Sequence, residues 1–178
     1  CMVAHIPELV ESGAASFKVE GRMKSALYVA TTARAYRRAI DDYFASEALY
    51  RSRIEWYERE VSSCTNRTFT TGFFFGKPSE ESMIYDASTY VAGAVYLGYV
   101  EEVVFRDGRW LARMTQRNKF SAGDAVEIMS PQGGNLSVSV LQLFDEEGNM
   151  INSVPHAKQR FYVDVGRKLE VFDILRKR

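Results

Sequence analysis

Three charged residues at alternate positions, Glu20, Arg22 and Lys24, are the first in this chain whose spacing suggests chemistry. Ser25 follows them where the N-cap of a helix beginning at Ala26 would stand. Two cations beside the free amides and the positive dipole end of a helix suit a phosphate or a carboxylate. The alternative is an ordinary charged turn in which Arg22 pairs with Glu20. Both interpretations stay open, and the three residues are the candidate catalytic residues.

The elements around this turn predict a strand–turn–helix unit. Ser16 to Val19 is a short run with a β-branched end, which favours a strand. The following apolar residues recur every three or four positions and predict a helix with one buried stripe: Leu27, Ala30, Ala33 (with Ala35), Tyr36 and Ile40. In α/β enzymes of the TIM-barrel type such a βα turn faces the ligand. Cys1 to Gly13 predicts a connector with a short helix, and 47–61 a second, charge-rich helix.

A phenylalanine-rich segment follows the helices, from Thr68 to Gly76. Its four phenylalanines could stack with nucleic-acid bases. We favour instead that they fill the junction with the next segment, because so many aromatic side chains are too apolar for all to stay in water. Arg67, Phe69 and Phe73 are the candidate substrate-binding residues of this segment.

From Tyr90 onward the hydrophobic period becomes two. Turn sequences recur every 8–12 residues or so, and Arg106-Asp107-Gly108-Arg109 is a strong hairpin signal. Six or seven short strands predict a small antiparallel β-barrel, since closure removes exposed edges. The fold class is therefore α+β. Three parts are expected: the end of a catalytic domain (1–76), a linker (77–89) and a barrel (90–178).

Basic residues of the barrel could form a phosphate-binding stripe. Arg113, Arg117 and Lys119 are its candidate substrate-binding residues, and Arg160, Lys168 and 176–178 would extend it. The barrel also carries almost as many acids as bases, so we favour a mixed, solvated surface, with the stripe as the alternative.

Composition excludes several classes of protein. The formal net charge is zero, and no apolar run approaches the roughly 18 residues of a membrane span. Two cysteines, Cys1 and Cys64, favour a reducing compartment and a cytoplasmic location over a disulfide framework. The chain contains no His-Glu-x-x-His motif and no context for a serine or cysteine nucleophile, so a self-contained protease is disfavoured. The opening at Cys1 favours a fragment of a longer protein.

Two blocks of sequence resemble a known family. Residues 17–25, followed by 28–30 and 35–37, are similar to a block near the end of the catalytic domain in the collagenase-like peptidases, numbered thirty-two among the peptidases of unassigned catalytic type. Residues 66–76 look like that family's next signature. Phe120, Gly123-Asp124 and the end of the chain resemble its C-terminal barrel. Here, however, Glu170-Val171-Phe172 replaces the more usual proline- or glycine-bearing approach to the last strand.

The resemblance implies two kinds of parent protein. Some relatives hydroxylate RNA and are thought to hold an iron–sulfur cluster on four cysteines, the last of which would correspond to Cys1. Cys1 would then be a ligand only in the full-length protein, and no cluster is expected in this chain. The family name implies instead a peptidase.

We therefore expect a recognition barrel, inactive by itself, joined to the end of a catalytic domain. The expected partners are RNA, above all tRNA, or an extended polypeptide, together with the missing N-terminal catalytic domain and no membrane. The parent is expected to be a tRNA uridine hydroxylation enzyme, with a collagenase-like peptidase as the alternative.

Overall fold

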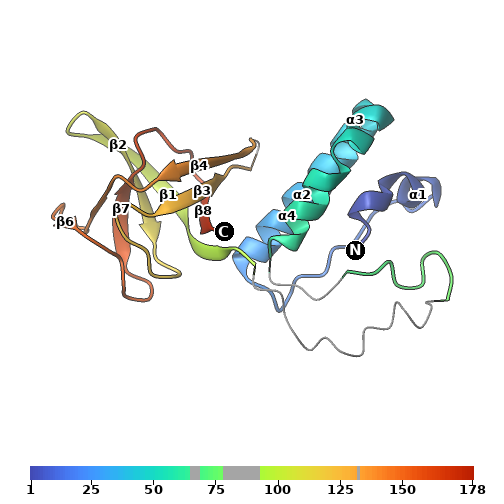
Figure 1. Ribbon diagram of the computed structural model, residues 1–178, viewed down its shortest axis with the longest axis horizontal. Helices are drawn as coiled ribbons and strands as arrows, with labels where there is room; N and C mark the ends of the chain where they lie inside the picture. Colours follow the sequence, from blue (N-terminus) through green and yellow to red (C-terminus); the bar gives the residue numbers. More distant parts are fainter. Residues whose placement is uncertain (65–68, 78–92, 132) are drawn as a thin grey trace. The chain divides into compact units, whose positions relative to one another are not determined.

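The computed structural model of the 178-residue chain describes residues 1–64, 69–77, 93–131 and 133–178 (Figure 1). The chain divides into two compact units, Cys1–Gly93 and Ala94–Arg178. Each unit has a hydrophobic core of its own. Most of the predicted linker, 77–89, lies outside the described residues. Among the residues that are described, no helix is long and apolar enough to cross a membrane.

The first unit is helical. Its elements are η1 (Val3–His5), α1 (Ile6–Glu11), α2 (Ala26–Ala45), α3 (Glu47–Ser52) and α4 (Ile54–Ser62). The predicted N-cap is confirmed, because the Tyr28 amide donates to Ser25 Oγ at 3.2 Å. The helix predicted over 47–61 is interrupted at Arg53, where the backbone leaves helical geometry and separates α3 from α4.

The buried face of α2 agrees in part with the predicted stripe. Leu27 and Ala35 are buried as predicted, Ala39 is buried although it was not predicted, and Ala33 is exposed. The small side chains mark the contact, since Ala35 and Ala39 share a core with the stacked rings of Tyr50 and Tyr57. Close packing against large rings selects small residues, which a hydrophobicity pattern does not register.

The strand predicted at Ser16–Val19 is not formed. A strand needs a hydrogen-bonded neighbour, and the described part of the helical unit contains no other strand to pair with it. The segment is extended backbone leading into α2. Membership of a TIM-barrel-type unit stays a prediction.

The second unit is an antiparallel, curled sheet of eight strands, not six or seven. These are β1 (Val95–Arg106), β2 (Arg109–Thr115), β3 (Ala125–Met129), β4 (Asn135–Ser139), β5 (Gln142–Phe144), β6 (Met150–Ile151), β7 (Arg160–Asp164) and β8 (Ile174–Lys177). Their order is β4-β3-β8-β1-β2-β7-β5-β6. In this ladder β4 and β6 are end strands, so the closed barrel we predicted is seen only as a curled half-barrel.

The extra strand comes from a break in one predicted strand. We expected a single strand from Leu136 to Phe144, but the chain turns at Val140 and Leu141. As a result β4 pairs with β3, whereas β5 pairs with β7. The apolar run was continuous in sequence because both strands face the same core.

β1 holds the two halves of the sheet together. It pairs with β8 over Val95–Tyr99 and with β2 over Val100–Arg106, with register shifts beside Gly98 and Val100. A Cβ at Gly98 would lie 2.9 Å from the carbonyl oxygen of Thr115. The predicted bulged strand is therefore confirmed, and the glycine permits the close approach. The predicted hairpin is confirmed too, with positive φ at Asp107 and Gly108 as a type I′ turn requires.

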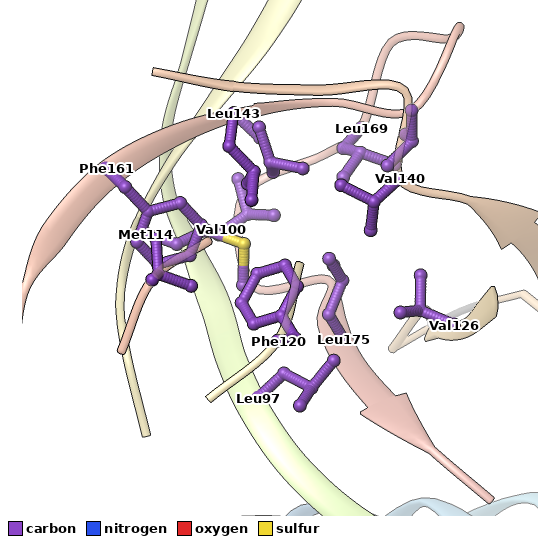
Figure 2. Packing of buried hydrophobic residues seen from close by; sticks show 14 of the residues in the cluster. Leu97, Val100, Met114, Phe120, Val126, Val140, Leu143, Phe161, Leu169 and Leu175 are labelled. Carbon is purple, nitrogen blue, oxygen red and sulfur yellow. The ribbon is translucent and has the colours of Figure 1, made fainter. Parts of the chain in front are cut away.

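Figure 2 shows the core of the sheet unit. Phe120, which enters from the connection before β3, lies among side chains of several strands, including Leu97 and Leu175. Its ring meets Phe161 edge to face at 5.4 Å between centroids. These residues fix the connection between β2 and β3 to the sheet.

The approach to β8 is a tight turn built without glycine. Phe172 adopts a φ of 73°, in the left-handed region that bulky residues rarely enter. Its amide donates to the Val100 carbonyl, and the Val100 amide donates to the Asp173 carbonyl. The turn is closed by Asp173 Oδ2, which accepts from the Glu170 amide at 2.9 Å. The turn replaces the first half of the strand predicted over 171–175.

Candidate functional site

A pocket of about 590 Å³ lies in the helical unit, between segment 16–20 and helix α2. Cys1, Glu20 and Phe69 line it, so three of the predicted site residues meet there. The sequence placed these residues in separate motifs. They come together because the segment before α2 runs back along the helix.

Tyrosine and threonine side chains of α2 contribute to the polar part of the pocket wall. Tyr36 accepts a hydrogen bond from the Met2 amide at 2.8 Å, and its hydroxyl lies 3.6 Å from Cys1 Sγ. Burial is the main cause that raises the pKa of Tyr36, so it stays neutral at physiological pH. Thr32 is only 3% exposed, and within the described ranges its hydroxyl has no hydrogen-bond partner. The sequence pointed to Tyr36 only as part of the apolar stripe and of the family resemblance, and no sequence signal pointed to Thr32.

The charged turn is only partly drawn into the pocket. Glu20 lines it, while Arg22 and Lys24 are exposed and are not among the lining residues. The Arg22 amide donates to Glu20 Oε1 at 3.1 Å, and Lys18 Nζ lies 3.7 Å from Glu20 Oε2. Lys24 Nζ lies 5.4 Å from the centre of the Tyr28 ring. The Tyr28 amide at the helix N-terminus already donates to Ser25 Oγ, so an anion at this turn would have to use the other free amides together with Arg22 and Lys24.

The phenylalanines of the next segment are exposed within the helical unit. Phe69 is 37% exposed and Phe73 78% exposed, and Phe74 and Phe75 lie between these values. The junction that they were expected to fill lies largely outside the described residues, so that interpretation stays a prediction. Phe75 contacts the His5 ring edge to face at 4.8 Å. Arg67, the third candidate of this segment, lies outside the described residues.

Most cations of the predicted phosphate stripe are paired with acids of the sheet unit. Arg113 Nε lies 3.2 Å from Glu102, and Arg160 lies 3.7 Å from Glu146. The same holds for four further residues: Lys168 with Glu170, Lys177 with Asp124, and both Arg176 and Arg178 with Glu127. Their charge is largely compensated, which supports the mixed-surface alternative for this part of the stripe.

Arg117 and Lys119 differ from the rest of the stripe. Both are exposed, in the loop after β2. Neither has a carboxylate within ion-pair distance among the residues that the structure places. Arg117 interacts instead with the Tyr96 hydroxyl, a contact that works against the larger effect of burial, which raises the Tyr96 pKa. These two residues are therefore the strongest candidates for contact with a polyanion.

The two cysteines of the chain lie in different surroundings. Cys1 is exposed, whereas Cys64 is buried, with its Sγ facing the Leu27 carbonyl. Over the described ranges, no three His, Cys, Asp or Glu side chains come together as metal ligands. Of the two thiols, Cys1 is therefore the one that a ligand could reach.

Comparison with known proteins identifies the class to which these two units belong. Residues 1–84 match the model described as "Peptidase family U32", and residues 93–176 match "Peptidase family U32 C-terminal domain". The chain therefore belongs to peptidase family U32.

Particular relatives carry two different names. The chain is 33% identical over 99% of its length to "tRNA hydroxylation protein P1" of Bacillus subtilis, and covers 41% of that protein. It is 25% identical over 96% of its length to a "Collagenase" of Porphyromonas gingivalis, and covers 40% of that protein. The chain thus spans about two fifths of the length of these relatives.

A solved structure is also similar. It is the C-terminal domain of a protein described as a U32 peptidase from Geobacillus thermoleovorans, at 28% identity and a TM-score of 0.42. The match covers 47% of this chain and 92% of that domain.

Proposed function

We propose that this chain is the C-terminal part of a tRNA hydroxylation protein and that its sheet unit binds the RNA. The observation that carries the proposal is the 33% identity to a tRNA hydroxylation protein, which extends over 99% of the chain and so includes both units. The exposed cations Arg117 and Lys119 support it, because phosphate contacts need cations that are not already neutralised.

The hydroxylation itself would need groups outside this chain. The pocket of the helical unit, with Glu20 at its wall, would complete a site built mainly by the rest of the protein. Arg22 and Lys24, at the exposed turn, would attract an anionic substrate or co-substrate to that site. The chain alone would bind RNA without modifying it. Cytoplasmic location and a cluster ligated by Cys1 in the longer protein belong to the same proposal.

Binding of the chain to tRNA across a salt series tests the proposal. We expect saturable binding whose affinity falls steeply as salt rises from about 50 to 200 mM, because each phosphate contact releases counterions. Filter binding or fluorescence anisotropy with labelled bacterial tRNA gives the measurement. Failure to bind tRNA at the lowest salt would reject the role proposed for the sheet unit.

A peptidase is the second candidate, because a relative named as a collagenase aligns with 96% of the chain. In that case the sheet unit would bind an extended polypeptide. Saturable binding of denatured collagen, with no affinity for tRNA in the same buffer, would favour this candidate over RNA modification.

A further inference from the structure

Two loops of the sheet unit, residues 116–119 after β2 and 155–159 before β7, lie side by side. The Gln116 amide donates to the Gln159 carbonyl at 2.8 Å, and the Lys158 amide donates to the Gln116 carbonyl at 3.2 Å. The pairing continues beyond the loops, since the Val154 amide donates to the Phe120 carbonyl. Residues about forty positions apart in sequence therefore form one surface.

This surface is basic and contains no acid. The first loop carries Arg117 and Lys119, and the second carries His156 and Lys158. Neither loop contains an aspartate or a glutamate. We call Arg117, Lys119, His156 and Lys158 the two-loop cluster. All four are exposed, and among the described residues none of them lies within ion-pair distance of a carboxylate. In this respect the four residues differ from cations such as Arg113 and Arg160, which are paired with acids.

The backbone of both loops is fixed by hydrogen bonds. The Arg117 amide donates to the Leu97 carbonyl, and Asn118 Nδ2 donates to the Tyr96 carbonyl at 2.7 Å. In the second loop the Gln159 amide donates to the His156 carbonyl, and the His156 amide donates to Gln159 Oε1. The cations are thus presented on an ordered backbone.

Lys158 stands at an unfavourable backbone position. Its φ is 62°, the left-handed region in which a side chain costs conformational energy and which glycine would occupy more easily. Backbone positions of this kind occur often at functional sites, so they point to a hypothesis of function. Here the residue in question is a cation on the basic surface.

We propose that the two-loop cluster binds the phosphodiester backbone of RNA, with Arg117, Lys119 and Lys158 contacting phosphates. The proposal rests on the RNA-binding function proposed above and specifies its site. Exposed cations gain from phosphate contact without first losing an acid partner, and the gain is independent of base sequence. Lys158 was not expected from the sequence, because only the fold brings it beside Arg117.

Two triple variants of the full chain test the proposal with equal loss of charge. The first carries Arg117→Gln, Lys119→Gln and Lys158→Gln. The control carries Lys168→Gln, Lys177→Gln and Arg178→Gln, which are all paired with acids. Both are titrated with labelled bacterial tRNA over a range of salt, and circular dichroism verifies that each is folded.

We expect the first variant to bind tRNA at least about tenfold more weakly near 0.1 M salt. Its slope of log affinity against log salt should be smaller by about two to three, because each lost phosphate contact removes roughly 0.7–0.9 from the slope. The control should stay within about twofold of the unmodified chain. Equal losses in the two variants, or no loss in the first, would overturn the site while leaving RNA binding intact. If the unmodified chain binds denatured collagen and no tRNA, the proposed RNA-binding function itself is rejected, and the two-loop cluster with it.

Discussion

At the scale of single residues, the buried charges of the helical unit serve its structure. Asp42 is 8% exposed and accepts hydrogen bonds from Arg53 at 2.9 Å and from the Tyr57 hydroxyl at 2.6 Å. Burial by itself would raise the pKa of Asp42. The hydrogen bonds from Tyr57 and Arg53, with the nearby guanidinium groups of Arg53 and Arg38, outweigh burial and hold the pKa below its usual 3.8. The network joins α2 to the break between α3 and α4.

Replacing this carboxylate should cost stability in a pH-dependent way. Because the folded-state pKa is lowered, the contribution of Asp42 is fully present above about pH 3.8 and is lost as pH falls through the folded value. We expect Asp42→Asn to destabilise the helical unit by about 1–3 kcal/mol at pH 7. The difference should shrink in strong acid, as urea unfolding at several pH values would measure.

The neighbouring aspartate supplies the control for this prediction. Asp41 makes an exposed pair with Arg37 one turn away, so Asp41→Asn should change stability by only about 0.3–0.5 kcal/mol. A difference for Asp42→Asn that stays constant down to the lowest pH would contradict the proposed role of its charge.

Phe172 offers a second prediction at this scale. Its left-handed backbone costs an L-residue about 1–2 kcal/mol, part of which glycine regains despite its larger unfolded-state entropy. We expect Phe172→Gly to raise stability by up to about 1 kcal/mol, measured by thermal unfolding. Val171→Gly, which replaces an exposed neighbour without positive φ, should lower stability. A Phe172→Gly variant as unstable as Val171→Gly would show that the ring makes compensating contacts.

At the scale of elements, Gly98 decides whether β1 can serve both halves of the sheet. A methyl group there would meet the Thr115 carbonyl oxygen at 2.9 Å and the Met114 side chain at 3.0 Å. The backbone oxygen cannot move aside without disturbing the end of β2. The glycine is therefore required where β1 changes its pairing partner from β8 to β2.

We expect Gly98→Ala to destabilise the sheet unit by about 1–3 kcal/mol, in the range of overpacked sites. Gly134→Ala is the matched control, because nothing lies within 4 Å of a Cβ there and its φ is not positive. The control should be neutral or slightly stabilising, by about 0.4–1 kcal/mol. Denaturant midpoints compare the two, and equal midpoints would disprove the close-approach argument.

The same scale shows what the sequence could predict. Ser25 and Asp107-Gly108 act through local backbone geometry, so the start of α2 and the hairpin were predictable. The prediction of a strand at Ser16–Val19 was wrong, because a strand needs a neighbouring strand to which it can hydrogen-bond. The break between α3 and α4 at Arg53 and the break between β4 and β5 at Val140 were not predicted. In both cases the apolar pattern of the sequence continues across the break.

Prediction of the site had the same limit. Arg117 and Lys119 were found as cations, but the sequence could not separate them from Arg113, whose partner Glu102 is opposite it on the next strand. Lys158 was missed because its relation to Arg117 arises from pairing between distant loops. Glu20, Cys1 and Phe69 were each singled out, while their meeting in one pocket with Thr32 required the fold.

At the scale of the whole molecule, the two units have separate cores. Among the described residues, the core of the sheet unit draws on residues from Leu97 to Leu175, and that of the helical unit on residues from Val3 to Val61. We expect residues 94–178, made alone, to unfold cooperatively with a midpoint close to that of the sheet unit in the full chain. Thermal circular dichroism measures this. A non-cooperative transition of the isolated part would mean that it depends on the helical unit.

The carboxylates that occupy most arginines and lysines of the sheet unit have a consequence for experiments in acid. Protonation of these carboxylates would leave their cationic partners without a neutralising charge. The surface of the sheet unit would then bind any polyanion more strongly than it does at neutral pH. The ion pair of Asp124 with Lys177 would persist to a lower pH than that of an ordinary aspartate, because hydrogen bonds from Lys177 and from the Ser121 amide lower the pKa of Asp124. We therefore expect selective binding of a polyanion at the two loops near neutral pH, where most of the remaining cations of the stripe are paired with carboxylates.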